Sequence, residues 1–255
     1  GVEQAAQAAG YSVLLGDTRH EPEREERYGE MLRRKEADGL IFLGHRLPAV
    51  LADMVRTLGP RAPIVNGCEF SPELGVSSAH IDNERAAVEA MEHLYGLGHA
   101  RIGVITGPLA SPISRDRLDG VHAAAKAHGR DDDLTVVTGD FSVEAGLDQT
   151  LKLLERPQPP TAIFCFSDEM AMGALDALRR RGLRCPQDVS VVGFDDIRFA
   201  KHVSPALTTV AQPMDAIGAE AVRVLLDIFA GKAETLQQVT LPHRLVVRES
   251  TGPAA

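Results

Sequence analysis

The sequence lacks a hydrophobic run long enough to cross a membrane. Its longest apolar stretches, GLIFLG at 39–44 and TAIFCF at 161–166, are far shorter than the roughly 18 residues that a membrane span requires. Cysteine is also scarce. The three cysteines, Cys68, Cys165 and Cys185, are an odd number and show no C-x-x-C spacing. This usage favours a protein of the reducing cytoplasm. We therefore expect a cytoplasmic protein with no membrane role.

An excess of basic residues is missing as well. Lys and Arg total 27 against 36 Asp and Glu, which leaves a formal charge of −9. Nucleic acid would be repelled on average unless the basic residues gathered on one face. The densest basic runs, at 33–35 and 179–181, lie in helical patterns, where a solvated helix face is the ordinary explanation. The chain by itself is therefore not predicted to bind DNA.

The motifs of several enzyme classes are absent. The sequence has no H-E-x-x-H, no G-x-S-x-G, no phosphate loop ending in G-K-S/T and no G-x-G-x-x-G after a strand. Its nine histidines are scattered, without the spacing of metal ligands. We expect no enzymatic activity, no cofactor and no metal.

What the sequence does contain is a regular alternation of strand and helix patterns. With 255 residues, 44% of them hydrophobic and 25% charged, the chain has the composition of a globular protein. Strands are predicted at 11–16, 39–44, 62–66, 77–81, 101–106, 134–139, 161–165, 189–194, 207–211 and 237–247. Helices are predicted at 1–9, 21–36, 47–58, 84–97, 114–128, 142–155, 168–181 and 213–230. The pattern predicts an α/β protein with two similar doubly wound, parallel-sheet halves.

The first predicted element is a helix, whereas a doubly wound half normally opens with a strand. We therefore expect that the first strand lies upstream of Gly1 and that this sequence is a fragment.

Polar residues follow several predicted strands, at the sheet edge where open α/β sheets bind ligands. Asp195 and Asp196 follow the strand at 189–194, and Ser167 and Asp168 follow the strand at 161–165. Arg117 lies near the start of the helix after the strand at 101–106. Each has a structural alternative, because Ser167 and Asp168 are suited to capping the next helix and Arg117 to pairing with a neighbouring carboxylate.

Six motifs, in order along nearly the whole chain, resemble the effector-binding domain of the lactose-repressor family. They are GHARIGVITGP at 98–108, RLDG at 117–120, FSDEMAMGAL at 166–175, DVSVVGFDD at 188–196, LTTVAQP at 207–213 and LVVREST at 245–251. Within the family, five further segments are most similar to the cytidine-responsive repressors. These are GHRLP at 44–48, EFSPEL at 69–74, HIDN at 80–83, GDF at 139–141 and PQPPT at 157–161.

The resemblance implies the fold of the type I periplasmic binding proteins, with two subdomains and three chain crossings. Residues 1–81 and 213–241 would form the first subdomain, and residues 83–211 and 243–255 the second. A DNA-binding headpiece would precede Gly1 in the intact protein, and a small ligand would bind in the cleft between the subdomains. The resemblance also implies a homodimer that reaches operator DNA through the headpieces.

The family's ligand contacts can be carried over by position. Arg117 and Asp195 match the principal polar ligand residues, and Phe141 matches an aromatic wall. Ser167 matches a hydrogen-bonding position, and Gln212 a crossing residue near the cleft. The resemblance also places His45 and Cys68 at ligand-contacting loops, although a solvent-exposed loop is an equal alternative for His45.

Many relatives have Asp where this chain has Cys68, which favours a less hydroxylated ligand than a sugar. Asp82 and Asn83 are expected to form a crossing and a helix cap.

Together these residues predict the ligand-sensing and dimerising core of a bacterial transcriptional regulator. Its ligand is expected to be a nucleoside, cytidine first, with a hexose as the main rival. A periplasmic sugar-binding transport receptor is the alternative from another class, and a nucleoside hydrolase would need a metal or nucleophile that the sequence does not offer. Replacing Arg117 or Asp195 is expected to weaken ligand binding and to leave the stability of the ligand-free protein nearly unchanged.

Overall fold

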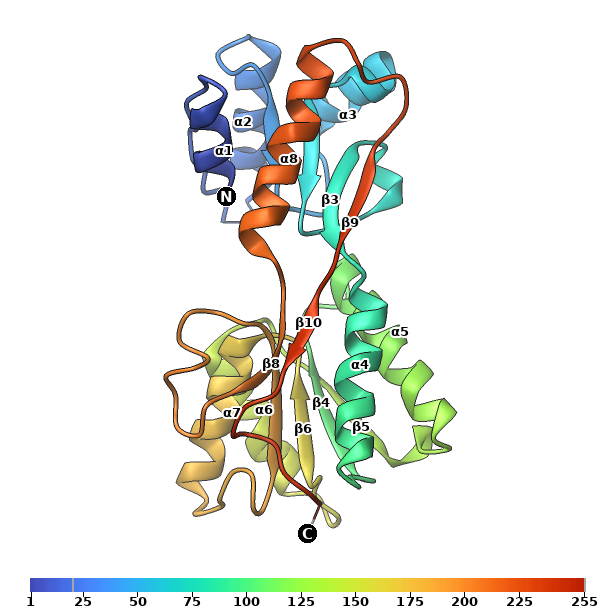
Figure 1. Ribbon diagram of the computed structural model, residues 1–255, viewed down its shortest axis with the longest axis vertical. Helices are drawn as coiled ribbons and strands as arrows, with labels where there is room; N and C mark the ends of the chain where they lie inside the picture. Colours follow the sequence, from blue (N-terminus) through green and yellow to red (C-terminus); the bar gives the residue numbers. More distant parts are fainter. Residues whose placement is uncertain (20, 255) are drawn as a thin grey trace. The chain divides into compact units, whose positions relative to one another are not determined.

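The computed structural model describes residues 1–19 and 21–254, and the chain divides into two compact units (Figure 1). Unit 1 comprises Gly1–Ile81 and Pro213–Leu241, and unit 2 comprises Asp82–Gln212 and Pro242–Ala255. The chain therefore passes from one unit to the other three times.

Unit 1 is built around a four-stranded parallel sheet in the order β1-β2-β3-β9. Its strands are β1 (Leu40–Phe42), β2 (Ile64–Gly67), β3 (Ser77–Ile81) and β9 (Gln238–Leu241), and its helices are α1 (Val2–Ala8), α2 (Pro22–Arg33), α3 (Ala49–Leu58) and α8 (Met214–Phe229). Helix α8 packs against all four strands and against α1. A cluster of Leu32, Leu51, Ile64 and Val76 forms the core beneath α2 and α3.

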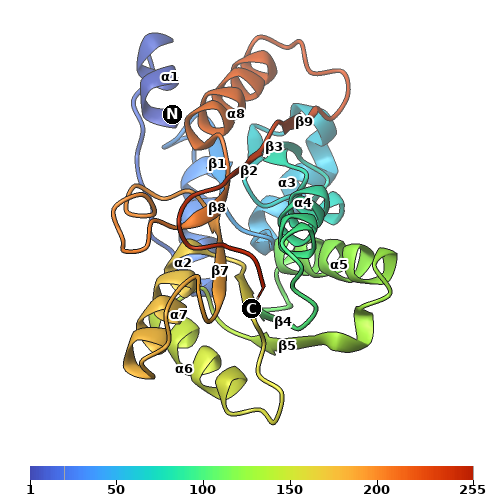
Figure 2. The same ribbon diagram turned by 60° about the horizontal axis from the view of Figure 1, so that its bottom comes forward.

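Unit 2 contains a six-stranded sheet in the order β10-β8-β7-β6-β4-β5, parallel except for β10, which runs antiparallel to β8. The strands are β4 (Ile102–Thr106), β5 (Leu134–Thr138), β6 (Ala162–Cys165), β7 (Ser190–Asp195), β8 (Thr208–Ala211) and β10 (Arg244–Val246). The helices are α4 (Asn83–Gly96), α5 (Pro112–Ala127), α6 (Val143–Leu154) and α7 (Asp168–Arg180). The sheet lies between the pair α4 and α5 and the pair α6 and α7 (Figure 2).

The continuous apolar strands of unit 2 explain this layering. Strands β4, β6 and β8 are buried along their whole length, as expected for parallel strands covered by helices on both faces. Side chains of Asp82, Ser142 and Ser167 accept hydrogen bonds from the first turns of α4, α6 and α7, which fixes where these helices begin. The α/β architecture with two mainly parallel sheets confirms the fold class predicted from the sequence.

Two strand predictions need correction. Residues 11–16 form no strand in the described part of the chain, and Leu15 is 93% exposed. A strand needs a hydrogen-bonded neighbour, and within residues 1–19 and 21–254 the edge strand β1 pairs with β2 alone. The predicted strand at 237–247 is divided into β9 and β10, because the chain leaves unit 1 at Pro242, which has no N–H to donate.

Candidate ligand-binding site

Arg117 is held in one orientation by three contacts within unit 2. Its Nε donates to Asn83 Oδ1 at 2.9 Å, and its Nη1 donates to the carbonyl oxygen of Phe166 at 2.6 Å. The guanidinium carbon lies 3.5 Å from the ring centroid of Phe194, a cation–π contact. The side chain is buried, with 2% exposure. These contacts join α5 to the start of α4 and to the ends of β6 and β7, so a positive charge is fixed at the carboxyl edge of the sheet.

Asp195 and Gln212 meet at the same edge. Asp195 is the last residue of β7, and its Oδ1 accepts a hydrogen bond of 2.7 Å from Gln212 Nε2. Burial raises the pKa of Asp195, whereas the Arg117 charge and the Gln212 hydrogen bond act in the opposite direction. The structure therefore brings together Arg117, Asp195 and Gln212, which the sequence placed on three different elements.

Phe141 lies over Gly107, which directly follows β4, and β6 separates β4 from β7 in the sheet. A Cβ atom on Gly107 would stand 2.0 Å from the Phe141 ring, so this close approach requires glycine. The Phe141 carbonyl accepts a hydrogen bond of 3.4 Å from Ser167 Oγ. An aromatic side chain is thus placed beside β4.

Ser167 is the N-cap of α7, as its structural alternative predicted. Its Oγ accepts a hydrogen bond of 3.2 Å from Met170 N while donating to Phe141. Asp168 behaves differently, because its carboxylate accepts hydrogen bonds from the backbone of Ile197 and from Thr209 Oγ1. A ligand contact by Ser167 stays a prediction.

Strained backbone coincides with several candidate residues. Within the described part of the chain, six non-glycine residues have positive φ: Arg19, Lys35, Cys68, Phe141, Asp195 and Asp196. Cys68, Phe141 and Asp195, with φ of 62°, 72° and 112°, are ligand residues predicted from the sequence. Such conformations cost about 1–3 kcal/mol each and are concentrated at functional sites. Three of these six residues are thus positions predicted to contact ligand, and their contact with ligand stays a prediction.

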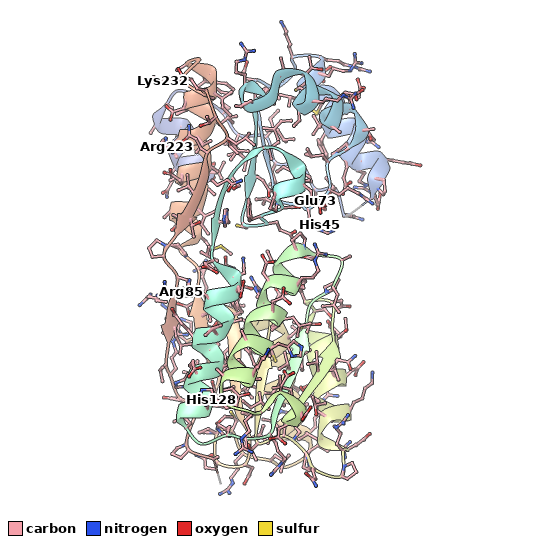
Figure 3. The ribbon with its side chains drawn as sticks, turned by 90° about the vertical axis from the view of Figure 1, so that its right-hand side faces the viewer. His45, Glu73, Arg85, His128, Arg223 and Lys232 are labelled. Atoms are coloured by element: carbon pink, nitrogen blue, oxygen red, sulfur yellow. The ribbon has the colours of Figure 1, made fainter. Side chains whose placement is uncertain are left out.

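In unit 1, the candidate residues His45 and Cys68 lie in the segments after β1 and β2. Figure 3 labels His45. His45 Nδ1 is 3.2 Å from Glu69 Oε2, and Cys68 N donates to the carbonyl oxygen of Ala79 at 2.9 Å. Cys68 also lines a largely apolar cavity of about 540 Å³ together with residues of α1, β1 and α8. The carboxylate of Glu69, rather than a group at position 68, is therefore the acidic group beside His45.

Several residues of the site were not found from the sequence. Asn83 was expected in a helix cap, but Asp82 provides the cap and Asn83 holds Arg117. Phe194 was read only as a strand residue, and Glu69 only as part of a motif. The pairing of Asn83 with Arg117 joins residues 34 positions apart and leaves no local signal in the sequence.

Neither a metal site nor a membrane span is found among the described residues. No group of three or more His, Cys, Asp or Glu side chains in residues 1–19 and 21–254 is arranged to hold a metal ion. No helix in this part of the chain is long and apolar enough to cross a bilayer.

Known proteins are similar to this chain in sequence and in fold. Residues 91–251 match the periplasmic binding protein-like domain family. The chain is 41% identical over 252 residues to the transcriptional repressor CytR of Escherichia coli K12, covering 98% of this chain and 73% of CytR.

Two solved structures of transcriptional regulators are also similar to this chain. A LacI transcriptional regulator from a Rhodococcus species is 33% identical with a TM-score of 0.85, covering 99% of this chain and 92% of that one. A LacI family regulator from Enterococcus faecium with bound ribose is 26% identical with a TM-score of 0.87, covering 100% and 92%.

Proposed function

Because the chain belongs to the LacI family of transcriptional regulators and forms its ligand-sensing domain, we propose that it binds a nucleoside, cytidine first. The domain is a sensor and not an enzyme, since its relatives are transcriptional regulators. The observation that carries the ligand proposal is the presence of a fixed guanidinium and a carboxylate at one sheet edge of unit 2. Arg117 supplies donors and Asp195 supplies an acceptor for hydroxyls or for the edge of a base.

The other candidate residues give this site a shape suited to a base. The Phe141 ring offers an aromatic face, and stacking of aromatic rings adds about 0.5–1.5 kcal/mol beyond area burial. We propose Ser167 and Gln212 as hydrogen-bonding contacts from unit 2, and His45 and Cys68 as contacts from unit 1. A thiol at position 68 favours a ligand with fewer hydroxyls than a hexose, and CytR is a relative at 41% identity.

Ligand binding is proposed to control operator binding in the cytoplasm by a homodimer. The operator would be bound by headpieces outside this chain, and ligand would shift the balance between two conformations of the dimer. Sedimentation at micromolar concentration is expected to give about twice the 27.4 kDa of one chain. A monomer at every concentration tested would contradict the dimer but leave the ligand proposal standing.

A sugar ligand is the second candidate, because the Enterococcus faecium relative was crystallised with ribose. Calorimetry against cytidine, adenosine, ribose and a set of hexoses separates the two. If the base contributes, cytidine is expected to bind several kcal/mol more tightly than ribose, because ribose lacks the stacked part of the ligand. Ribose or a hexose binding more tightly than every nucleoside would refute the nucleoside proposal and leave the sensor domain intact.

A further inference from the structure

Asp168 is a buried carboxylate whose two oxygens both hold the segment after β7. It is the first residue of α7 and has 0% exposure. One oxygen, Oδ2, accepts from the backbone N–H of Ile197 at 2.8 Å, and the other, Oδ1, accepts from Thr209 Oγ1 at 2.5 Å. Thr209 Oγ1 in turn accepts from Asp196 N at 3.4 Å. Both backbone N–H groups that follow Asp195 are thus tied, directly or through Thr209, to one carboxylate.

The segment held by Asp168 has a strained backbone. Asp195 and Asp196 have φ of 112° and 56°. Backbone conformations of this kind persist only where the surrounding structure holds them in place. Gly193 allows the contact, because a Cβ atom there would stand 2.2 Å from Asp168 Oδ1. The carboxylate therefore lies against the backbone of β7, immediately before the residues whose conformation it holds.

We propose that Asp168 is a positioning residue that keeps residues 195–197 in the ligand-binding conformation and so sets ligand affinity without touching the ligand. The affinity part of this proposal rests on the proposed function, whereas the structural part does not. Asp195 carries the carboxylate offered to the ligand, and its direction follows from its own φ and from the two peptide groups after it. An acceptor for these N–H groups holds that direction before ligand arrives.

The charges around Asp168 make its protonation state sensitive to pH. The pKa of Asp168 is raised to about 7, mainly by burial and to a smaller extent by the charges of Asp195 and Asp196, while the hydrogen bonds from Thr209 and Ile197 oppose the rise. Arg248 donates to Asp196 at 2.6 Å, and the Arg117 charge opposes the rise that burial causes in the pKa of Asp195. The nearby basic groups therefore interact with these two carboxylates. Cys165 also faces Asp168, and burial raises the pKa of its thiol. Protonation turns one Asp168 oxygen from an acceptor into a donor and weakens the hold on the loop.

The structural part is tested by NMR of the ligand-free protein between pH 5 and 9. The amide signals of Asp196 and Ile197 are expected to titrate with a midpoint near 7, together with the Asp168 carboxyl carbon. Asp168→Asn should abolish this titration, and Thr209→Val should shift the Asp196 amide more than the Ile197 amide. Asp176→Asn is the matched control, because Asp176 lies on the same helix and pairs with Arg179 and Arg180 at its other end. It should leave the titration unchanged.

The affinity part is tested by calorimetry with cytidine on the same variants. Asp168→Asn is expected to weaken binding roughly tenfold at pH 8, since Asn keeps only one of the two acceptor oxygens, and Thr209→Val roughly threefold, since it removes the hydroxyl that links Asp196 N to Asp168 but leaves the bond to Ile197 N. Asp176→Asn should bind as the wild type does. Wild-type affinity should fall as the pH drops through 7, and in Asp168→Asn that step should be missing.

Each outcome separates the two claims. If the amide signals of residues 196 and 197 do not respond to pH in the wild type or in Thr209→Val, the positioning role is overturned. This conclusion holds even if Asp168→Asn does not fold. Altered amides with unchanged cytidine affinity overturn the link to binding. A wild type that binds neither cytidine nor any other probe refutes the proposed function, while the NMR result still decides the role of Asp168.

Discussion

Both units are built on mainly parallel sheets that differ in strand order, and they fix their strand-end residues in different ways. In unit 2, the buried side chain of Arg117 joins α5 to α4 and to the segment after β6, and buried Asp168 joins α7 to the segment after β7. In unit 1, the candidate residue His45 pairs with Glu69, and both side chains are partly exposed. The side chains of unit 2 that we propose as ligand contacts are therefore held in place without ligand, which would reduce the ordering cost of binding. We expect unit 2 to provide most of the affinity and unit 1 to adjust selectivity.

The largest difference between the units is expected on comparing Arg117→Ala with His45→Ala. Arg117→Ala should weaken cytidine binding by about 2–4 kcal/mol, because it leaves a desolvated partner unpaired. His45→Ala should cost about 0.5–1.5 kcal/mol of binding, the net contribution of a single hydrogen bond, because its side chain is partly exposed. Calorimetry measures both. Equal losses in the two variants would mean that the units contribute alike.

The structure changes one expectation for the same variant. Arg117→Ala also removes the donors to Asn83 Oδ1 and to the Phe166 carbonyl, so the ligand-free protein should lose about 1–3 kcal/mol of stability. The sequence alone suggested almost no change. Thermal denaturation of Arg117→Ala beside Lys126→Ala, an exposed position near the end of the same helix, tests this.

Most of the fold could be predicted from the sequence because its signals are local. The helices and the buried strands each appear as a run with period 3.6 or as a short apolar segment, and the structure places them within a few residues of the prediction. The segment 11–16 reads just as clearly as a strand. Its conformation depends on a hydrogen-bonded neighbour, which no local pattern encodes.

Only part of the candidate site could be predicted from the sequence. Arg117, Asp195 and Gln212 were predicted by position in a family motif, and the structure brings them to one edge of the sheet. The residues that orient them, Asn83 and Asp168, bond across 34 and 29 positions of sequence. Both were read as candidates for a helix cap, because a polar residue at a helix start gives the same local signal whether it caps the helix or holds a distant loop.

A smaller effect is expected at the aromatic wall of unit 2. Gly107→Ala should displace the Phe141 ring and weaken cytidine binding by about 0.5–1.5 kcal/mol, the range of an aromatic stacking contact. Gly96→Ala is the matched control, because a Cβ at Gly96 meets nothing within 4 Å. If Gly107→Ala bound cytidine as tightly as Gly96→Ala, Phe141 would not be part of the site.

Acid is expected to weaken unit 2 through the partly buried His93 and the buried His99. Burial lowers the pKa of His93 and His99, so between their folded and unfolded values the unfolded chain binds more protons. Their contribution to stability is therefore present above about pH 6.5 and is lost as the pH falls below it. His99 contacts Ser190 Oγ and the carbonyl oxygen of Gly252, which joins β7 to the C-terminal segment.

Denaturation at pH 5, 6 and 7.5 tests this for the wild type and His99→Asn. The variant should show a smaller loss between pH 7.5 and 5. Asp168 acts with the opposite sign, since a raised pKa makes its stability contribution largest in acid and smaller as the pH rises through about 7. His99 and His99→Asn are therefore also compared in proteins that carry Asp168→Asn, in which the opposite effect of Asp168 is absent. If the wild type and His99→Asn lost the same stability between pH 7.5 and 5, the loss would come from groups other than His99.

The smallest effect is expected at the exposed apolar segment of unit 1. Leu15 is 93% exposed, so Leu15→Ser should change stability by less than about 0.5 kcal/mol. Ile64→Ala, in the core of the same unit at 1% exposure, should cost about 2–5 kcal/mol. Urea denaturation compares the two, and sedimentation of each variant reports the oligomeric state. A loss above about 1 kcal/mol for Leu15→Ser, or a shift from dimer to monomer, would show that the segment 11–16 is covered in solution by a second copy of the chain. The exposure of the segment 11–16 in unit 1 would then be a property of the single chain, and this segment would be buried in the dimer.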